Sequence, residues 1–463
     1  MKVESLSRGK KIVYSLGQFG WSLLMGLIST WLVWYFNPPE VSGLAIRIPQ
    51  GALLGGLTII GIISAAGRLL DAVTDPWIAT LSDRLNHPKG RRIPFMRWGA
   101  IPAAILGWLA FVSPVAGESL WNVAFLTLAL MGFYVAFTMY VTPYFALVSE
   151  FGHTPDEKLD LSTYISLTWF LGFAVSTLVP SVWGIFEQFM DKNTAVQLSL
   201  SLFAGAALIF MLIPAYALDE KRYSHGQPSN ESVWQSLKAT FANKNFRIFV
   251  VSDLVYWFSL TIFQTGIIYF VTVSLVQPEQ TAGLILPLSG ILSFLCYPLV
   301  NLLAKRTGKK RLMVLGFFLF TIAFIYTGFV GPILEGIGIP LALQAYLIAL
   351  LTGIPLAIFG ILPNAIVADV AESDGIATGQ FREGMFFGAR TFVQKLGQSL
   401  GLLIFSSFLL FGRDVGDDLG IRLAALAAAV LMLGSGFLFF KYREKEVLAG
   451  LSKTTVQTKG AQQ

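Results

Sequence analysis

Long apolar runs separated by short polar stretches dominate the pattern of this 463-residue chain. A helix needs about 20 apolar residues to cross a membrane, and twelve of these runs are close to that length or longer. They lie at 12–36, 51–82, 94–113, 119–149, 161–186, 196–218, 246–275, 281–304, 312–331, 339–369, 384–412 and 420–441. The pattern therefore predicts an all-α membrane protein with twelve transmembrane helices.

A polar segment at 219–245 divides these runs into two sets of six. The two halves repeat weakly, since DPWIATLSDRLNHPKGRR (75–92) is echoed by YPLVNLLAKRTGKKR (297–311). Internal repeats with a solute site between the halves are typical of secondary transporters. We predict an N-terminal six-helix bundle (1–218), a cytoplasmic central loop (219–245), a C-terminal six-helix bundle (246–441) and a disordered cytoplasmic tail (442–463).

Composition supports a membrane protein. The chain is 55% hydrophobic and 13% charged, with a mean hydropathy of +0.67, whereas soluble domains carry about 25% charged residues. A single cysteine, Cys296, excludes an intramolecular disulfide, and three histidines do not match it as a metal site. No phosphate-binding loop is present, so ATP-driven transport is not expected. We also expect no enzymatic activity.

Basic residues predict the orientation. They cluster at Lys10 and Lys11, in the loops 84–92 and 305–311, and from Lys441 onwards, all on one predicted side. By the positive-inside rule both termini are cytoplasmic, which suits the plasma membrane. The net charge of +6 therefore reflects topology, and we expect no nucleic-acid partner.

Two acids lie in the second apolar run. Asp71 and Asp75 stand one helical turn apart, so both project from one face. A charged side chain at membrane depth costs about 3 kcal/mol on insertion scales, so the pair needs a partner. A structural ion pair with Arg68 is one interpretation. With two acids and only one nearby base, one carboxylate keeps an uncompensated negative charge, which favours a bound Na⁺ or H⁺.

Two basic residues lie in the eleventh run. Lys395 falls near mid-membrane, where the acidic pair is its best predicted partner; the alternative is a lysine that reaches the cytoplasmic interface. Arg390 either anchors an anionic solute or pairs with Asp369 or Glu383 at a cytoplasmic gate, and we prefer the gate. Other solute contacts are expected from polar and aromatic residues on the inner helices: Tyr14, Gln18, Ser22, Tyr140, Tyr256, Trp257 and Gln264.

The stretch 67–84, with its D-A-x-x-D-P motif followed by a short basic loop, carries a resemblance. It is similar to the second helix of the glycoside-pentoside-hexuronide cation symporters, the melibiose-permease-like branch of the major facilitator superfamily. The resemblance implies that fold, with two pseudo-symmetric bundles, and cation-coupled symport. It further implies a coupling-cation site, metal-binding if the cation is Na⁺, formed by Asp71, Thr74, Asp75 and Thr138 and coupled to Lys395.

The sugar-binding positions depart from the family pattern. Where melibiose permeases use two aspartates, a tryptophan and an arginine, an ungapped comparison places Ser22, Val141, Phe145 and Ser166. The acids and the arginine that grip a galactoside are therefore replaced. A lysolipid transporter of the same fold is an alternative, as is a non-transporting membrane sensor or scaffold.

The sequence as a whole predicts a symporter. We expect Na⁺ or H⁺ to drive transport of a small organic solute, sugar-like or glycoside-like, by alternating access. Arg68 supports the acids and Lys395 couples cation to solute. The protein is expected to be a monomer in contact with membrane lipid, with no cofactor besides the coupling ion.

Overall fold

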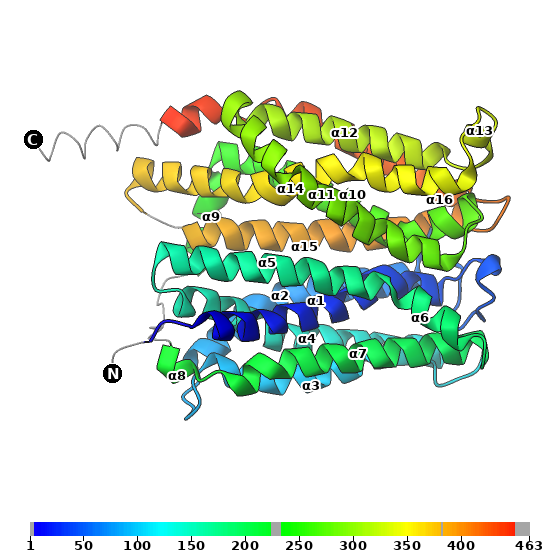
Figure 1. Cartoon of the computed structure of the whole chain (residues 1–463), viewed down its shortest axis with the longest axis horizontal. Coiled ribbons are helices and arrows are strands. Elements are labelled where there is room, and N and C mark those ends of the chain that lie inside the picture. Colours follow the sequence, from blue (N-terminus) through cyan, green and yellow to red (C-terminus); the bar gives the residue numbers. More distant parts are fainter. Residues whose placement is uncertain (1–3, 224–232, 381–382, 450–463) are drawn as a thin grey trace, which may run out of the picture. The chain divides into compact units, whose positions relative to one another are not determined.

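The computed structural model describes residues 4–223, 233–380 and 383–449. Long helices dominate these residues (Figure 1). They are α1 (Arg8–Phe36), α2 (Ile59–Arg84), α3 (Arg92–Leu109), α4 (Leu120–Phe151), α5 (Pro155–Thr177), α7 (Lys192–Ala217), α10 (Lys244–Tyr269), α11 (Glu279–Thr307), α12 (Lys309–Phe329), α14 (Leu341–Thr378), α15 (Glu383–Phe408) and α16 (Leu419–Phe439). Parts of the predicted central loop and tail lie outside the described residues.

Shorter elements connect the long helices. They are η1 (Glu40–Ser42), β1 (Ala52–Leu53), η2 (Leu54–Gly56), β2 (Leu57–Thr58), α6 (Val179–Phe186), α8 (Glu220–Tyr223), α9 (Val233–Ala242), η3 (Phe270–Ser274), α13 (Pro332–Glu335) and η4 (Leu409–Phe411). Each long helix lies in or over one of the predicted apolar runs.

Ten helical segments of the described part are long and apolar enough to cross a membrane. The chain is therefore a multi-pass membrane protein. Helices α2 and α3 are not among the ten. The middle of α2 carries Arg68, Asp71 and Asp75, and α3 has only 18 residues, of which two are arginines.

The start of the second predicted run is wrong. Residues 52–58 form a two-stranded antiparallel hairpin, β1 and β2, in which Ala52 pairs with Thr58. The turn contains Gly55 and Gly56, whose φ angles of 69° and 95° are left-handed and therefore suit glycine. Helix α2 begins only after Thr58, whose hydroxyl accepts the N–H of Gly61 at 3.2 Å.

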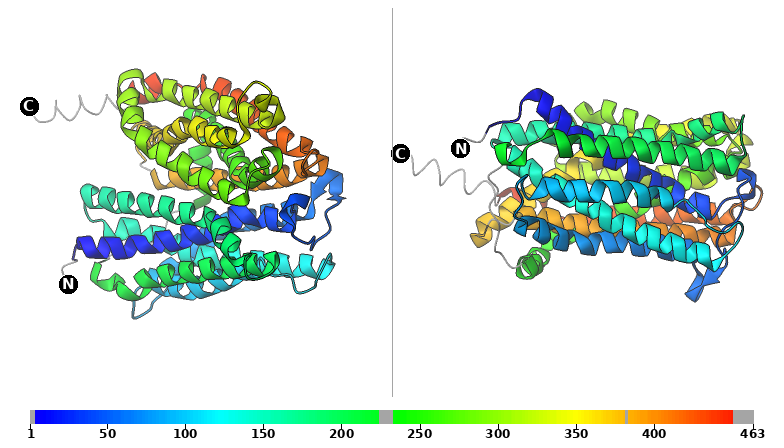
Figure 2. Two further views of the ribbon diagram at one scale, coloured as in Figure 1. Left: turned by 45° about the vertical axis from the view of Figure 1, so that its right-hand side comes forward. Right: turned by 90° about the horizontal axis from the view of Figure 1, so that it is seen from below.

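Two compact units make up the chain. Among the described residues, the first comprises 4–223, 264–287 and 402–419, and the second comprises 233–263, 288–380, 383–401 and 420–449. In the first unit α1 packs against α5 and α7, while α4 packs against α2 and α3 (Figures 1 and 2). In the second unit α12 packs along α14.

The first unit includes the end of α10 and the start of α11. The Tyr269 hydroxyl donates to the carbonyl of Asn37 at 2.7 Å. Glu279 at the start of α11 accepts from Trp183 Nε1 at 2.9 Å and pairs with Lys192 Nζ at 2.8 Å. These bonds fasten segments from the second half of the sequence to helices of the first half.

Candidate functional site

The acidic pair on α2 lies inside the first unit. Asp71 is almost fully buried, with 1% of its surface accessible, and Asp75 is half-buried. One oxygen of Asp71, Oδ2, accepts from the Arg68 guanidinium at 2.8 Å. Arg68 is itself buried and lies 3.7 Å from the sulfur of Met25. The ion pair that the sequence offered as one interpretation is therefore present.

Hydroxyl groups occupy the other side of Asp71. Its Oδ1 accepts from Thr138 Oγ1 on α4 at 2.7 Å, and Thr138 lies 3.3 Å from Thr74 Oγ1. The Thr74 hydroxyl is also within 2.9 Å of the carbonyl of Leu70. Three of the four residues predicted for the cation site thus form one hydrogen-bonded group.

The second acid has a threonine of its own. Asp75 Oδ1 accepts from Thr142 Oγ1 of α4 at 3.0 Å. Sequence reasoning missed Thr142, although its spacing was a signal: Thr138 and Thr142 are four residues apart on α4, as Asp71 and Asp75 are on α2. Side chains at i and i+4 share a helix face, so two facing helices bring both pairs together.

A proline follows each member of the second pair. Asp75 precedes Pro76 on α2, and Thr142 precedes Pro143 on α4. A proline has no N–H to donate to the carbonyl four residues earlier, which here is that of Ala72 or Met139. The side chains of the site supply carboxylate oxygens from α2 and hydroxyl oxygens from α2 and α4. Hard oxygen ligands of this kind suit Na⁺ or a proton.

Close helix packing holds α2 against α4. A Cβ added at Gly67 would lie 2.6 Å from the ring of Tyr134 on α4, so only glycine allows this approach. At the far end of α2, Arg92 donates to Ser82 at 2.5 Å and to Glu150 at 3.3 Å. Both the middle and the end of α2 are thus tied to neighbouring helices of the same unit.

A buried carboxylate fixes the start of α3. Glu220 of α8 accepts the main-chain N–H groups of Arg91, Arg92 and Ile93 at 2.7, 2.8 and 2.9 Å. These donors lie at a helix N-terminus, where N–H groups lack partners within the helix. Burial raises the pKa of Glu220 above its ordinary value, although the three N–H donors act in the opposite direction.

The predicted solute residues of the first unit fall into two groups. Tyr14, Tyr140 and Ser22 use their hydroxyls internally, donating to the carbonyls of Tyr144, Met211 and Phe19. Gln18 differs from these three, because its Oε1 is buried and has no hydrogen-bond partner among the described residues. Gln264, on α10, is half-buried.

Trp21 was not predicted and resembles Gln18 in this respect. Its indole Nε1 is buried without a partner among the described residues. Its ring meets Phe137 and Phe145 of α4 edge to face, at centroid distances of 5.7 and 5.8 Å. Trp21 lies three residues after Gln18, on the same face of α1, and this spacing was the available signal.

The second unit holds the remaining predicted residues. Tyr256 stacks on Phe359 with ring centroids 4.2 Å apart, and its ring meets that of Trp257 edge to face at 5.3 Å. Lys395 is half-buried on α15. Its relation to Asp71 and Asp75 of the other unit stays a prediction.

Arg390 pairs differently from our prediction. Its guanidinium binds Asp253 of α10, with contacts of 2.8 and 3.2 Å, and Asn364 of α14 at 2.5 Å. Asp369, one of the two predicted partners, instead binds Lys309 at 2.5 Å. Asp253 is 1% accessible and Arg390 9%, and a buried arginine requires a close anion. The nearest carboxylate from a neighbouring helix therefore satisfies it.

Comparison with known proteins identifies relatives along most of the chain. The family model described as MFS/sugar transport protein matches residues 13–442. An uncharacterized symporter of Synechocystis, sll1374, is 23% identical over 87% of this chain and 86% of its own length. The putative glycoside/cation symporter YagG of Escherichia coli is 24% identical over 86% of this chain and 81% of its own.

Solved structures share the fold. The nucleoside transporter NupG, as its D323A mutant, superposes with a TM-score of 0.67 over 94% of this chain and 99% of its own. The two sequences are 16% identical, so the likeness concerns the fold alone. Family and fold together identify the chain as a membrane transporter and not an enzyme.

Proposed function

We propose that this chain, a member of the MFS/sugar transport protein family, is a glycoside-pentoside-hexuronide symporter that couples uptake of a glycoside-like solute to Na⁺ or H⁺. The proposal includes twelve membrane-spanning helices, because α2 and α3 add to the ten apolar helical segments. It also includes alternating access between two bundles. The observation that carries it is the pairing of Asp71 with Thr138 and of Asp75 with Thr142 across α2 and α4.

Charge balance explains why this group suits one monovalent cation. Arg68, Asp71 and Asp75 together carry one formal negative charge. A bound Na⁺, a proton on a carboxylate, or Lys395 supplies the balancing positive charge. We infer that Lys395 and the cation compete for the acids or share them, so that cation occupancy is linked to helix movement.

Thr138 and Thr142 have two tasks in this scheme. Each threonine donates a hydrogen bond to a carboxylate, and this bond favours the ionised form of the acid and fixes its orientation. Each hydroxyl oxygen also keeps lone pairs that a hard cation accepts as ligands. Thr74 adds a third hydroxyl to the same group.

Buried polar atoms on α1 support a solute rich in hydroxyl groups. Gln18 offers an unsatisfied acceptor and Trp21 an unsatisfied donor, one turn apart. Leaving such groups unpaired costs roughly 1–3 kcal/mol each, so a ligand that pairs them gains that amount. A sugar hydroxyl is both donor and acceptor, and the aromatic rings of Trp21 and Phe145 suit the apolar face of a sugar ring.

Uptake into proteoliposomes tests the proposal. Labelled glycosides, hexuronides and a lysophospholipid are each offered under an inward Na⁺ gradient, an inward pH gradient, or neither. We expect a glycoside or hexuronide to accumulate only under one of the gradients, and Asp75→Asn to abolish accumulation. The control is Glu118→Gln, because Glu118 is exposed between α3 and α4 and lies outside the site.

The alternatives give different results in the same assay. Gradient-dependent uptake of the lysophospholipid alone would replace the glycoside with a lipid. Absence of flux for every solute, with wild type and Asp75→Asn indistinguishable, would favour a non-transporting sensor and contradict the proposal.

A further inference from the structure

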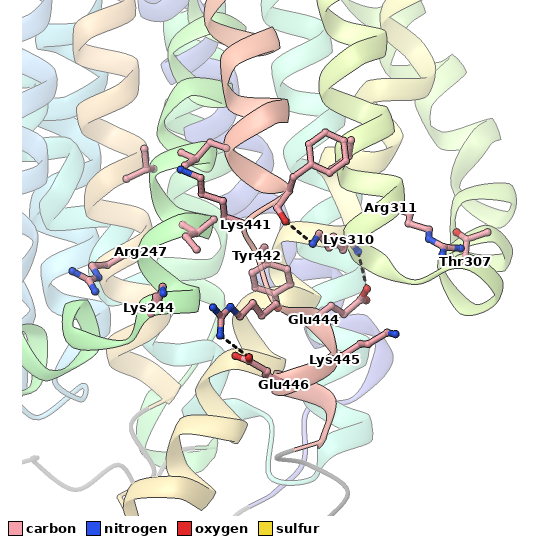
Figure 3. Close-up of a pocket in the computed structure, with 16 residues that line it drawn as sticks. Lys244, Arg247, Thr307, Lys310, Arg311, Lys441, Tyr442, Glu444, Lys445 and Glu446 are labelled. Atoms are coloured by element: carbon pink, nitrogen blue, oxygen red, sulfur yellow. Dashed lines mark hydrogen bonds and ion pairs between the residues drawn. The ribbon is translucent and has the colours of Figure 1, made fainter.

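Basic side chains surround a cavity of about 1330 Å³ in the second unit (Figure 3). The cavity lies where α10 and α12 begin and where α11 and α16 end. Helix α10 contributes Lys244 and Arg247, and α12 contributes Lys310 and Arg311. The stretch after α16 adds three more basic residues within 441–445.

Two glutamates also line the cavity, and each of them already has a partner. Glu444 accepts the main-chain N–H groups of Lys309 and Lys310 at 2.6 and 3.3 Å. Glu446 pairs with Arg443 at 2.7 Å. The lining thus carries seven basic and two acidic side chains, a formal sum of +5 (7 − 2). The cavity is strongly electropositive.

Most of the positive charge is exposed. Lys244, Arg247, Arg311, Lys441 and Lys445 are all solvent-accessible. No carboxylate of the described residues lies within ion-pair distance of any of the five. Clustered cations without counter-ions repel one another. An anion that binds among them relieves this repulsion, so the cavity favours anion binding.

One wall of the cavity is apolar. Val251, Val314, Leu438 and Phe440 belong to the lining, and Val251 and Phe440 are 48% and 52% accessible. A small soluble anion would use the basic rim and leave this wall uncovered. A ligand that matches both features carries an anionic head and an apolar tail.

We propose that this cavity binds an anionic phospholipid. The phosphate contacts Lys244, Arg247 and Lys441, and an acyl chain covers Val251 and Phe440. Basic pockets between transmembrane helices are suited to anionic headgroups for this reason. Its position at the basic ends of α10, α12 and α16 agrees with the cytoplasmic side predicted by the positive-inside rule.

Native mass spectrometry of the full-length protein tests the site. The protein is titrated with phosphatidylglycerol, with phosphatidylcholine and with glycerol 3-phosphate. We expect phosphatidylglycerol to bind more tightly than phosphatidylcholine, and Lys244→Gln/Arg247→Gln to weaken it by about 30-fold, since each basic residue near an anionic surface contributes about 1 kcal/mol. The matched control, Lys305→Gln/Arg306→Gln, removes two exposed basic residues from α11 that do not line the cavity and should retain wild-type affinity.

Three outcomes would overturn the proposal. Equal loss in both double variants would mean that surface charge in general attracts the lipid. Equal binding of the two phospholipids would mean that the headgroup is not recognised. Saturable binding of glycerol 3-phosphate as tight as that of phosphatidylglycerol would identify a soluble phosphate as the ligand. Unfolding temperatures of all variants in detergent establish that each is folded before lipid is added.

Discussion

At the scale of single residues, the proposed cation site depends on which side chain satisfies each buried charge. Asp71 accepts hydrogen bonds from the Arg68 guanidinium and the Thr138 hydroxyl, and Asp75 accepts one from the Thr142 hydroxyl. Removing the base of such a pair leaves an uncompensated buried charge, but removing a hydroxyl leaves the charge count unchanged. The threonines are therefore the better probes of function.

Replacing Thr142 with valine should weaken the cation site without unfolding the protein. Valine keeps the shape of threonine but cannot donate to Asp75. The Asp75 carboxylate then binds a proton more readily, and the proton competes with Na⁺. We expect the apparent Na⁺ affinity to fall about tenfold, since a hydrogen bond to a charged group contributes about 1.5–3 kcal/mol. Calorimetric Na⁺ titration measures this, with Thr142→Ser as the matched variant that retains the donor. Equal affinities for the valine and serine variants would contradict the assignment.

At the scale of elements, the positions of the helices along the chain were easier to predict than which helices pack against one another. Length and apolarity locate the long helices, but 51–58 was assigned to a helix because GALLGG is apolar, and the positive φ angles of Gly55 and Gly56 make it a hairpin. The acidic pair was predictable from its spacing on α2. Thr142 and the pairing of Arg390 with Asp253 were not predicted, because both depend on which helices are neighbours.

Close packing of α2 on α4 should make Gly67 intolerant of substitution. In Gly67→Ala the new methyl group meets the Tyr134 ring at 2.6 Å, and such overpacking costs roughly 1–3 kcal/mol. The thermal midpoint in detergent should fall accordingly. Gly205→Ala on α7 is the matched control, because nothing lies within 4 Å of its added Cβ and alanine favours a helix by about 1 kcal/mol. A Gly67→Ala protein as stable as Gly205→Ala would refute this packing.

The capping of α3 by Glu220 should show in the pH dependence of stability. Because burial raises its pKa, the folded state binds this proton more tightly than the unfolded state. The stabilisation that this protonated carboxyl gives the folded state is complete below the pKa of the unfolded chain, about 4.3. It is lost as pH rises through the pKa of the folded state. The stability of Glu220→Gln relative to wild type, measured by thermal unfolding, should therefore increase as pH rises across that window. A difference that is constant with pH would contradict the shift.

At the scale of the whole molecule, composition identifies a multi-pass membrane protein and the family model assigns it to transporters. The choice of solute depends on single atoms, such as Gln18 Oε1 and Trp21 Nε1, that hydropathy does not report. The predicted site residues of the second unit, Tyr256, Trp257 and Lys395, stay predictions for the same reason.

The predicted orientation has its own test. In a protein whose only cysteine is removed by Cys296→Ser, new cysteines are placed at Lys305, just before α12, and at Glu335, just after it, so that α12 separates the two positions. A membrane-impermeant maleimide added to intact cells should label Glu335→Cys and not Lys305→Cys, and inside-out vesicles should give the reverse. Labelling of Lys305→Cys in intact cells would invert the topology.

Whether Asp71 and Asp75 bind a coupling cation is decided by thermal unfolding of the purified protein. The protein is unfolded at increasing Na⁺ concentrations and several pH values, with choline keeping the ionic strength constant. A ligand that binds only the folded state raises its stability, so no knowledge of the solute is required. We predict saturable stabilisation by Na⁺, or a pH dependence in its place, that is present in wild type and absent in Asp75→Asn. Identical Na⁺ and pH profiles for the two proteins would contradict a coupling-cation site at Asp71 and Asp75.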